Sequence, residues 1–209
     1  MKISTFTCGV IDEKCYIAET DTSAIVIDPG LKNAELDLWL EKNSKKVKAI
    51  FLTHLHCDHI SYTGAVEKKT GADVFIHSLD NEHIFDPSYN LCSRLSRTYE
   101  VVKTEKEPIS VNDGDVITKG DITVKVLHTP GHTVGSACFL VDDILFSGDT
   151  LFHMSVGRTD LPTGSSEQLA NSLKKLKNLD HDITVYPGHG DPTTIGFEVK
   201  NNPWFIYAE

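Results

Sequence analysis

The feature that most constrains this chain is one short histidine-rich segment, residues 53–59 with the sequence THLHCDH. It follows an apolar run that is typical of a buried strand. Residues two apart on a strand project to the same side, so His54 and His56 face one way, and the following turn moves Asp58 and His59 to a neighbouring position. Four metal-ligand side chains within six positions therefore predict a site for two adjacent metal ions. Imidazole and carboxylate ligands suit zinc, and also iron or manganese.

Three later segments repeat the theme of a ligand beside a glycine, just after a predicted strand. They are PGHT at 130–133, SGDT at 147–150 and PGHG at 187–190. Glycine lets backbone and ligand approach closely, and strand ends place such segments along one edge of the sheets. The expected metal ligands are His54, His56, Asp58, His59, His132, Asp149 and His189.

The remaining histidines and the cysteine of the motif are expected to have ordinary structural roles. These histidines are His77, His83, His128, His153 and His181. His153 lies four residues after Asp149, so it is the one placed to line the mouth of the site. Cys57 is a soft potential ligand, but alternation along the segment points it away from His56 and favours packing.

The pattern of apolar residues predicts the order strand-rich, helix, strand, helix in the first half and strand-rich, helix, strand in the second. We expect strands at 14–18, 23–27, 47–52, 73–77, 122–127, 135–141, 144–146 and 182–186, and helices around 36–40, at 60–69 and at 165–177. Residues 78–108 carry little pattern and are expected to form a long connection with one short helix. Two similar halves indicate an α/β sandwich with helices outside two sheets.

Composition limits the class of protein. The chain has 209 residues, which fits one large domain or two small ones, and its formal net charge of −10 argues against nucleic acid as the partner. No apolar run approaches the roughly 18 residues of a membrane helix, and the N-terminus shows no secretory signal. The five cysteines form no CxxC pair. These features favour a cytoplasmic protein with reduced thiols that acts on a small molecule. They leave its oligomeric state open.

On these motifs, from Asp28 to His189, the sequence resembles the metallo-β-lactamase-fold superfamily. The resemblance is strongest to its short hydroxyacylglutathione hydrolase (glyoxalase II-like) branch, because of SVGRTDLPTG at 155–164, the helix that follows and NPWF at 202–205. The resemblance implies a single domain over 1–209 with the αββα four-layer sandwich, in which two mixed sheets have helices outside.

The resemblance also implies a role for each matching residue. The first metal would be held by His54, His56 and His132, and the second by Asp58, His59 and His189. Asp149 would bridge the two ions, and Asp28 would support the histidine cluster without binding metal. Two zinc ions per chain are therefore expected, with iron or manganese as alternatives.

Two departures from the family pattern stand out. The glyoxalase II proteins with a full glutathione site carry an extra helical C-terminal domain, and only twenty residues follow His189 here. Glutathione recognition therefore does not follow from the resemblance. Lys14 stands where the family often has Asn, and nothing catalytic depends on that position.

The expected activity is hydrolysis of a small thioester by a metal-bridging hydroxide. Two divalent ions, two carboxylates and one hydroxide sum to about +1, which favours an anionic substrate, and metal lowers the pKa of bound water to about 7. Asp58 is the expected catalytic residue that orients the hydroxide. A thiolate leaving group needs little acid help, which fits the lack of an obvious general acid. Arg158 is the candidate for gripping a substrate carboxylate, and a structural ion pair with Asp160 is the alternative.

Other activities of the fold stay open at this point. A persulfide dioxygenase-like enzyme would use one iron held by His54, His132 and Asp149. A lactonase or a β-lactamase-type hydrolase is a further alternative. A metal-binding scaffold without activity is disfavoured because no expected ligand is missing, and a nuclease is disfavoured by the acidic charge.

Overall fold

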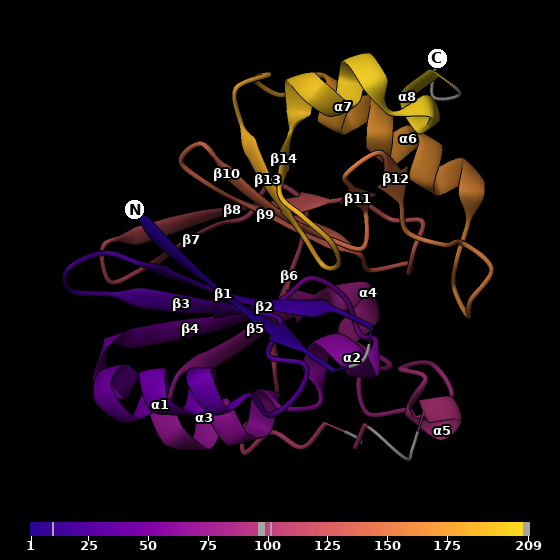
Figure 1. Cartoon of the computed structure of the whole chain (residues 1–209). Coiled ribbons are helices and arrows are strands. Elements are labelled where there is room, and N and C mark those ends of the chain that lie inside the picture. Colours follow the sequence, from indigo (N-terminus) through magenta and orange to yellow (C-terminus); the bar gives the residue numbers. More distant parts are fainter. Residues whose placement is uncertain (10, 96–98, 101, 207–209) are drawn as a thin grey trace.

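The computed structural model describes residues 1–9, 11–95, 99–100 and 102–206. Two six-stranded sheets lie face to face, and helices cover the outer face of each sheet (Figure 1). This is the predicted α/β architecture, the αββα four-layer sandwich with two mixed sheets and helices outside.

The first sheet is built from the N-terminal half of the chain. Its strands, in spatial order, are β1 (Lys2–Cys8), β2 (Glu13–Glu19), β3 (Ala24–Ile27), β4 (Val47–Leu52), β5 (Asp73–His77) and β6 (Ile109–Val111). The first three pair antiparallel, and β3 to β6 pair parallel. Parallel neighbours end at the same edge of the sheet, so the segments after β4 and β5 lie close together.

The second sheet comes from the C-terminal half. In spatial order it contains β14 (Thr193–Thr194), β13 (Thr184–Pro187), β10 (Ile144–Gly148), β9 (Ala137–Val141), β8 (Ile122–His128) and β7 (Val116–Lys119). Only β10 and β13 pair parallel. A small hairpin of β11 (Leu151–Phe152) and β12 (Ser155–Val156) follows β10.

The helices are short. They are α1 (Ala34–Asn43), the 3-10 turn η1 (Ser44–Lys46), α2 (Cys57–Ile60), α3 (Thr63–Thr70), α4 (Ser78–Asn81), α5 (Cys92–Leu95), α6 (Ser166–Lys177), α7 (Ile195–Asn201) and α8 (Pro203–Ile206). No helix in the described part of the chain is long and apolar enough to cross a membrane.

Alternation along the strands produces three apolar layers. One face of the first sheet packs on α1 and α3, as Ile50 packs with Leu36 and Val66. The inner faces of the two sheets meet around aromatic rings such as Phe51 and Phe139, which are tilted to each other with centroids 5.0 Å apart. The outer face of the second sheet packs on α6 and α8. Alternate side chains of the central strands point to opposite faces of a sheet, and both faces are buried. This pattern determines the order of the layers.

The strands at 47–52 and 73–77 are confirmed with the predicted bounds, and a left-handed glycine, Gly71 at φ 70°, ends α3. The single helix predicted over 60–69 is wrong at its start. The chain forms the separate turn α2 and begins α3 only at Thr63, because Ser61 and Tyr62 leave the helix and the Tyr62 amide donates to the Pro29 carbonyl at 3.0 Å.

Several further elements were not predicted, among them β1, α7 and α8. Strand β1 is mostly Ser, Thr and Lys and is half exposed at the edge of its sheet, so it lacks the apolar alternation of a buried strand. Helices α7 and α8 are too short for a periodic signal. The connection over 78–108 contains two short helices in its described residues instead of one.

Candidate metal centre

The histidine-rich segment makes the transition from β4 to α2. Thr53 follows the strand, and His56 is the residue before the first helical residue, with an extended backbone at φ −67° and ψ 144°. Asp58 and His59 then lie in the turn of α2. The sharp change from strand to helix places all four ligand-type side chains at one edge of the first sheet, as the sequence predicts.

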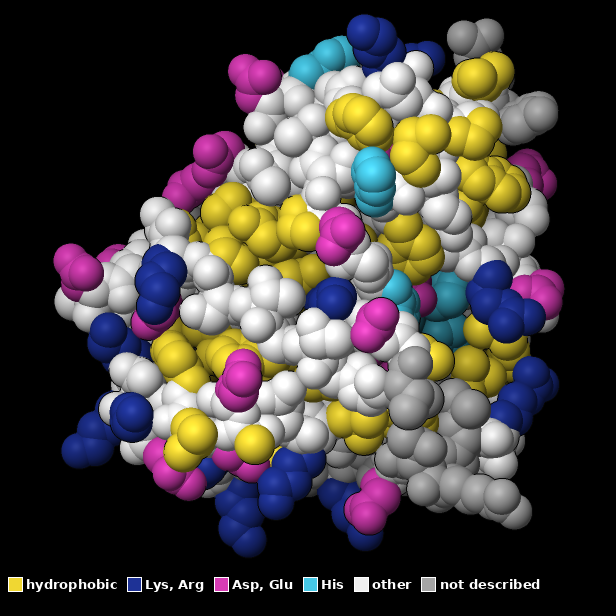
Figure 2. All heavy atoms as spheres, viewed as in Figure 1, with side chains coloured by type: hydrophobic (Ala, Val, Ile, Leu, Met, Phe, Trp, Pro, Cys, Tyr) yellow, Lys and Arg dark blue, Asp and Glu magenta, His cyan; other side chains and the backbone are white. Residues whose placement is uncertain are grey.

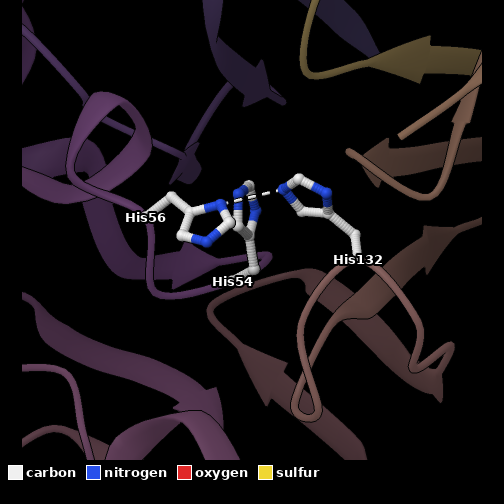
Figure 3. Close-up of side chains that lie close together, drawn as sticks. All are labelled: His54, His56 and His132. Carbon is white, nitrogen blue, oxygen red and sulfur yellow. Dashed lines mark hydrogen bonds between the residues drawn. The ribbon is translucent and has the colours of Figure 1, made fainter. Parts of the chain in front are cut away.

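The first group of ligands joins the two halves of the molecule. His54, His56 and His132 each offer a ring nitrogen within 4.8 Å of the others, and all three are buried (Figure 3). Nδ1 of His56 and Nε2 of His132 face each other at 2.8 Å. Among the described residues, the buried Nε2 of His54 has no hydrogen-bond partner. A buried nitrogen without a partner is costly, and a metal ion would satisfy it.

The second group has nearly tetrahedral spacing. Nε2 of His59 lies 3.3 Å from Nε2 of His189, 3.6 Å from Oδ2 of Asp58 and 3.4 Å from Oδ1 of Asp149. His189 Nε2 lies 3.4 Å and 3.6 Å from the same two carboxylate oxygens. A regular tetrahedron with such edges has its centre about 2.0–2.2 Å from each corner, which is the range of bonds from zinc to nitrogen and oxygen. The donor set therefore fits a metal ion, and it suits zinc, iron and manganese alike.

Asp149 lies between the two groups. Its Oδ2 is 3.4 Å from Nε2 of His132, and its Oδ1 is 3.4 Å from Nε2 of His59. Oδ1 is buried and has no hydrogen-bond partner in the described part of the chain. One oxygen directed to each group is the arrangement that a bridging carboxylate needs.

The second ring nitrogen of several histidines is held by an acceptor. His132 Nδ1 donates to the Arg158 carbonyl at 2.7 Å, and His189 Nδ1 donates to the Ile11 carbonyl at 2.8 Å. His59 Nδ1 lies 3.0 Å from Oδ2 of Asp28. An imidazole whose Nδ1 carries the proton presents a lone pair at Nε2. These contacts therefore orient Nε2 of all three rings for coordination.

Asp28 has the supporting position that the resemblance implies. Besides His59, it accepts from the backbone amide of Thr53 at 2.7 Å and from the Thr53 hydroxyl at 2.6 Å. It therefore supports the beginning and the end of the histidine-rich segment together.

The protonation of the cluster is set by burial and by the neighbouring charges. Burial, with the surrounding imidazoles, holds the pKa of His54 and of His56 well below the usual range, so both are neutral as ligands must be. Burial opposes protonation of His59 too, but Asp58, Asp149 and Asp28 outweigh it and raise the pKa of His59 to about 10. The carboxylates thus create a strong preference for positive charge at this point.

Close approach at the centre requires glycine at two places. A Cβ on Gly188 would lie 2.2 Å from Oδ1 of Asp149 and 2.7 Å from Cε1 of His59. A Cβ on Gly157 would lie 1.9 Å from the Asp149 carbonyl and 3.1 Å from Nδ1 of His132. The expectation that a glycine beside a ligand permits such contacts is met at Gly188, whereas Gly157 lies outside the three predicted segments.

All seven sequence-predicted ligands therefore converge, while other candidates lie elsewhere. Cys57 packs in an apolar cluster with Leu91, Cys92 and Tyr99. His153 packs against Phe197, with the two rings tilted to each other and their centroids 5.2 Å apart.

The remaining predicted site residue, Arg158, lies on the surface, with its side chain 62% exposed. Its Nε and Nη2 both donate to the Asp160 carboxylate at 2.7 Å. This is the ion pair that the sequence left as the alternative to substrate binding. Figure 2 shows histidine side chains reaching the surface beside Lys or Arg side chains at the boundary between the two halves.

Sequence reasoning missed one buried residue beside the cluster. Asp80 in α4 accepts hydrogen bonds from the segments that carry His54, His56 and His132. No motif surrounds it, and only the parallel pairing of β4 with β5 brings it near.

Relatives of known sequence match the chain over almost its whole length. An uncharacterized protein of Mycobacterium tuberculosis is 38% identical over 218 residues, which cover 98% of this chain and 97% of that protein. The probable metallo-hydrolase YqgX of Bacillus subtilis is 32% identical, with 98% of this chain and 97% of that protein covered. The hydroxyacylglutathione hydrolase GloC of Haemophilus influenzae is 28% identical, with 98% of each chain covered.

Solved structures share the fold. The B3 metallo-beta-lactamase BLEG-1 superposes with a TM-score of 0.88 at 35% identity, covering 97% of this chain and 99% of that one. TTHA1623, solved in a di-iron-bound form, has a TM-score of 0.85 at 31% identity and covers 96% and 99%. ETHE1 from Myxococcus xanthus has a TM-score of 0.76 at 29% identity and covers 97% and 84%.

A family model supports the same conclusion. The family described as the Metallo-beta-lactamase superfamily matches residues 9–189, a range that contains every residue of the His/Asp cluster. The chain belongs to the metallo-beta-lactamase superfamily, and its His/Asp cluster is a metal-binding site.

Proposed function

We propose that this chain, a metallo-hydrolase of the metallo-beta-lactamase superfamily, uses two metal ions to hydrolyse a small, anionic thioester. The observation that carries the proposal is the second ligand group beside the first, in which the ligand atoms of Asp58, His59 and His189 lie 3.3–3.6 Å from one another. A one-metal enzyme has no need for it. Similarity to the hydroxyacylglutathione hydrolase of Haemophilus influenzae over 98% of both chains supports the thioester.

When bound, two divalent cations supply a nucleophile from water near neutral pH and polarise the acyl carbonyl. The chain's own carboxylates set the charge of this site. Asp58 and Asp149 contribute −2 against +4, so the loaded site is positive before any substrate enters. A positive, partly buried site favours an anionic substrate and an anionic tetrahedral intermediate.

Asp58 is the proposed catalytic residue. Burial opposes its ionisation, but the neighbouring imidazoles, His59 above all, outweigh burial and hold the pKa of this carboxyl well below its usual range. At neutral pH Asp58 is therefore ionised, and it can accept hydrogen bonds but cannot donate one. It accepts a hydrogen bond from the attacking water and orients the oxygen lone pair towards the acyl carbon.

The proposal requires no protonated group for the leaving thiol. A thiol has a pKa of about 8.5, so a thiolate leaves readily near neutral pH without an acid. An alcohol or amine leaving group needs a proton donor at the departing atom. This difference favours a thioester over a lactone or an amide.

Arg158 is the proposed contact for the substrate's carboxylate. It lies on the segment whose carbonyl holds His132, and its guanidinium is exposed. The Asp160 carboxylate already occupies the guanidinium in a bidentate pair. A substrate carboxylate must therefore compete with Asp160 or share the guanidinium with it.

The first test is metal content, measured by mass spectrometry on protein expressed with zinc and iron both supplied. We expect about two metal ions per chain. The same protein is then assayed on matched thioester, lactone and β-lactam substrates. Thioester cleavage that exceeds the others in kcat/KM supports the proposal, and preference for a lactone or a β-lactam refutes the thioester.

A persulfide dioxygenase-like activity is the second candidate, favoured by the similarity to ETHE1 from Myxococcus xanthus. His54, His132 and Asp149 would then hold a single iron, with the Asp149 and His132 ligand atoms already 3.4 Å apart. About one iron per chain with little zinc, and oxygen consumption with a persulfide, would establish this activity in place of the hydrolase.

A further inference from the structure

A buried carboxylate outside the ligand set connects the two loops of the first metal group. Asp80 lies in α4, immediately after β5, and is 0% exposed. A buried carboxylate is costly unless hydrogen bonds satisfy its oxygens. The groups that donate hydrogen bonds to Asp80 therefore indicate the role of this carboxylate.

Those partners flank the metal ligands in sequence. Oδ2 of Asp80 accepts from the Leu55 amide at 2.9 Å and from the Thr133 hydroxyl at 2.8 Å. Leu55 stands between His54 and His56, and Thr133 directly follows His132. Oδ1 accepts from the Gly135 amide at 2.7 Å. One carboxylate thus binds the segment after β4 in the first sheet to the segment after β8 in the second.

The atoms of Asp80 and of the loop that carries His132 pack closely against each other. A Cβ on Gly135 would lie 2.5 Å from the Asp80 amide nitrogen and from Oδ1. The Thr133 hydroxyl also lies 2.8 Å from the Ser136 hydroxyl, which itself accepts from the Thr133 amide at 2.9 Å. The loop that carries His132 is therefore held at several atoms around this carboxylate.

Asp28 and Asp80 divide the support of the centre between them. Asp28 contacts the ring of His59, a ligand of the second group, and also Thr53. Among the described residues, the hydrogen bonds of the Asp80 side chain go to the backbone and hydroxyl groups beside the three ligands of the first group, not to a ligand itself.

We propose that Asp80 is a positioning residue that sets the spacing of His54, His56 and His132 and thereby the metal affinity of the first group. The inference rests on the metal-binding part of the proposed function and not on the substrate. Without the carboxylate, the loops from the two sheets lose their shared acceptor, and the imidazoles no longer face one point.

Asp80→Asn tests the inference with little change in volume. The amide replaces one acceptor oxygen by a donor, so at least one of the three donors loses its partner whichever way the amide turns. Metal-stripped protein is titrated with Zn²⁺ against a chromophoric chelator. We expect one binding step about 10- to 100-fold weaker than in the wild type, the range for residues that support ligands, and the other within about 3-fold.

Two further variants identify the affected group. Combining Asp80→Asn with His189→Ala should leave no tight site, because His189→Ala weakens the second group. Thr133→Val, which removes only the hydroxyl partner, should weaken the same step as Asp80→Asn. Their effects should be less than additive if both act through one contact. If Asp80→Asn does not fold, Thr133→Val still tests the inference.

The matched control is Glu67→Gln. Glu67 is also a buried carboxylate that accepts from backbone amides, those of Glu105 at 2.7 Å and Lys106 at 3.2 Å, but these amides adjoin no metal ligand. Its loss should lower thermal stability and leave both zinc affinities unchanged. If both zinc-binding steps of Asp80→Asn are unchanged, or if both lose affinity equally, the inference is overturned. A wild type that binds no zinc would instead refute the proposed function.

Discussion

At the scale of single residues, Arg158 is the site residue whose role the sequence left most open. Its bidentate pair with Asp160 is exposed, and solvent screens such pairs so that they add little to stability. Arg158→Ala should therefore leave the thermal midpoint nearly unchanged. If Arg158 binds the substrate's carboxylate, KM should rise about 10- to 100-fold at similar kcat, since a charge-assisted hydrogen bond is lost.

Steady-state kinetics on an anionic thioester check this, with Lys125→Ala as the control, because Lys125 is an exposed cation on β8. Asp160→Asn should lower KM, since it removes the competing carboxylate. An unchanged KM together with lost stability in Arg158→Ala would rule out the substrate role.

At the scale of elements, the turns that end the strands bring backbone against ligand. Gly188 follows β13, and a Cβ there would lie 2.2 Å from Oδ1 of Asp149. Gly188→Ala should therefore displace Asp149 or His59, remove at least one metal ion per chain and lower kcat/KM at least about 100-fold, as loss of a ligand's support does.

Gly71→Ala is the comparison that separates crowding from backbone strain. Gly71 ends α3 at φ 70°, and no atom lies within 4 Å of the point that a Cβ would occupy, so the substitution should cost about 1 kcal/mol and leave metal content unchanged. Metal analysis and denaturant unfolding of both variants make the test. Full metal content in Gly188→Ala would contradict the prediction.

At the scale of the whole molecule, a stacked pair of imidazoles joins the two sheets. His77 ends β5, His128 ends β8, and their rings are 3.9 Å apart and nearly parallel. Burial, with the neighbouring His128 and Lys175, lowers the pKa of His77 to about 4, against the opposing effect of Asp113 and Asp115. The folded protein therefore holds His77 neutral.

Stability should fall as this pair is acidified. Since the unfolded pKa is about 6.5, the unfolded chain binds more protons between pH 6.5 and 4, and folding loses about 2 kcal/mol from pH 7.5 to pH 5 through His77. His77→Gln should show a smaller loss by that amount. Urea unfolding of both proteins at the two pH values is the measurement. Equal losses would show that His77 does not titrate in this range.

Metal ions should also hold the two halves together, because the ligands come from both sheets. Removing metal with a chelator should lower the thermal midpoint by about 10 °C or more. The reason is that a free metal concentration of about 1,000 times Kd stabilises the folded state by about 4 kcal/mol per site. Calorimetry before and after chelation, and after zinc is restored, checks this. A thermal midpoint that stays unchanged after complete metal loss would contradict this prediction.

The sequence alone predicted the seven side chains that converge in the cluster, because these residues lie in short segments whose spacing and glycines reflect local geometry. HxHxDH at 54–59 places four of them directly after a strand, and the apolar runs on either side specify the layers. The fold class and the strands at 47–52 and 73–77 followed for the same reason, since burial repeats every second residue.

The tertiary structure decided what depends on residues far apart in the chain. The break between α2 and α3 arises where Tyr62 contacts Pro29. Asp80 reaches Leu55 and Thr133 only because β5 lies beside β4 and the two sheets stack. Such contacts leave no periodic or spacing signal in sequence, because hydrogen-bond partners 25 and 53 residues apart are brought together by the packing of the layers.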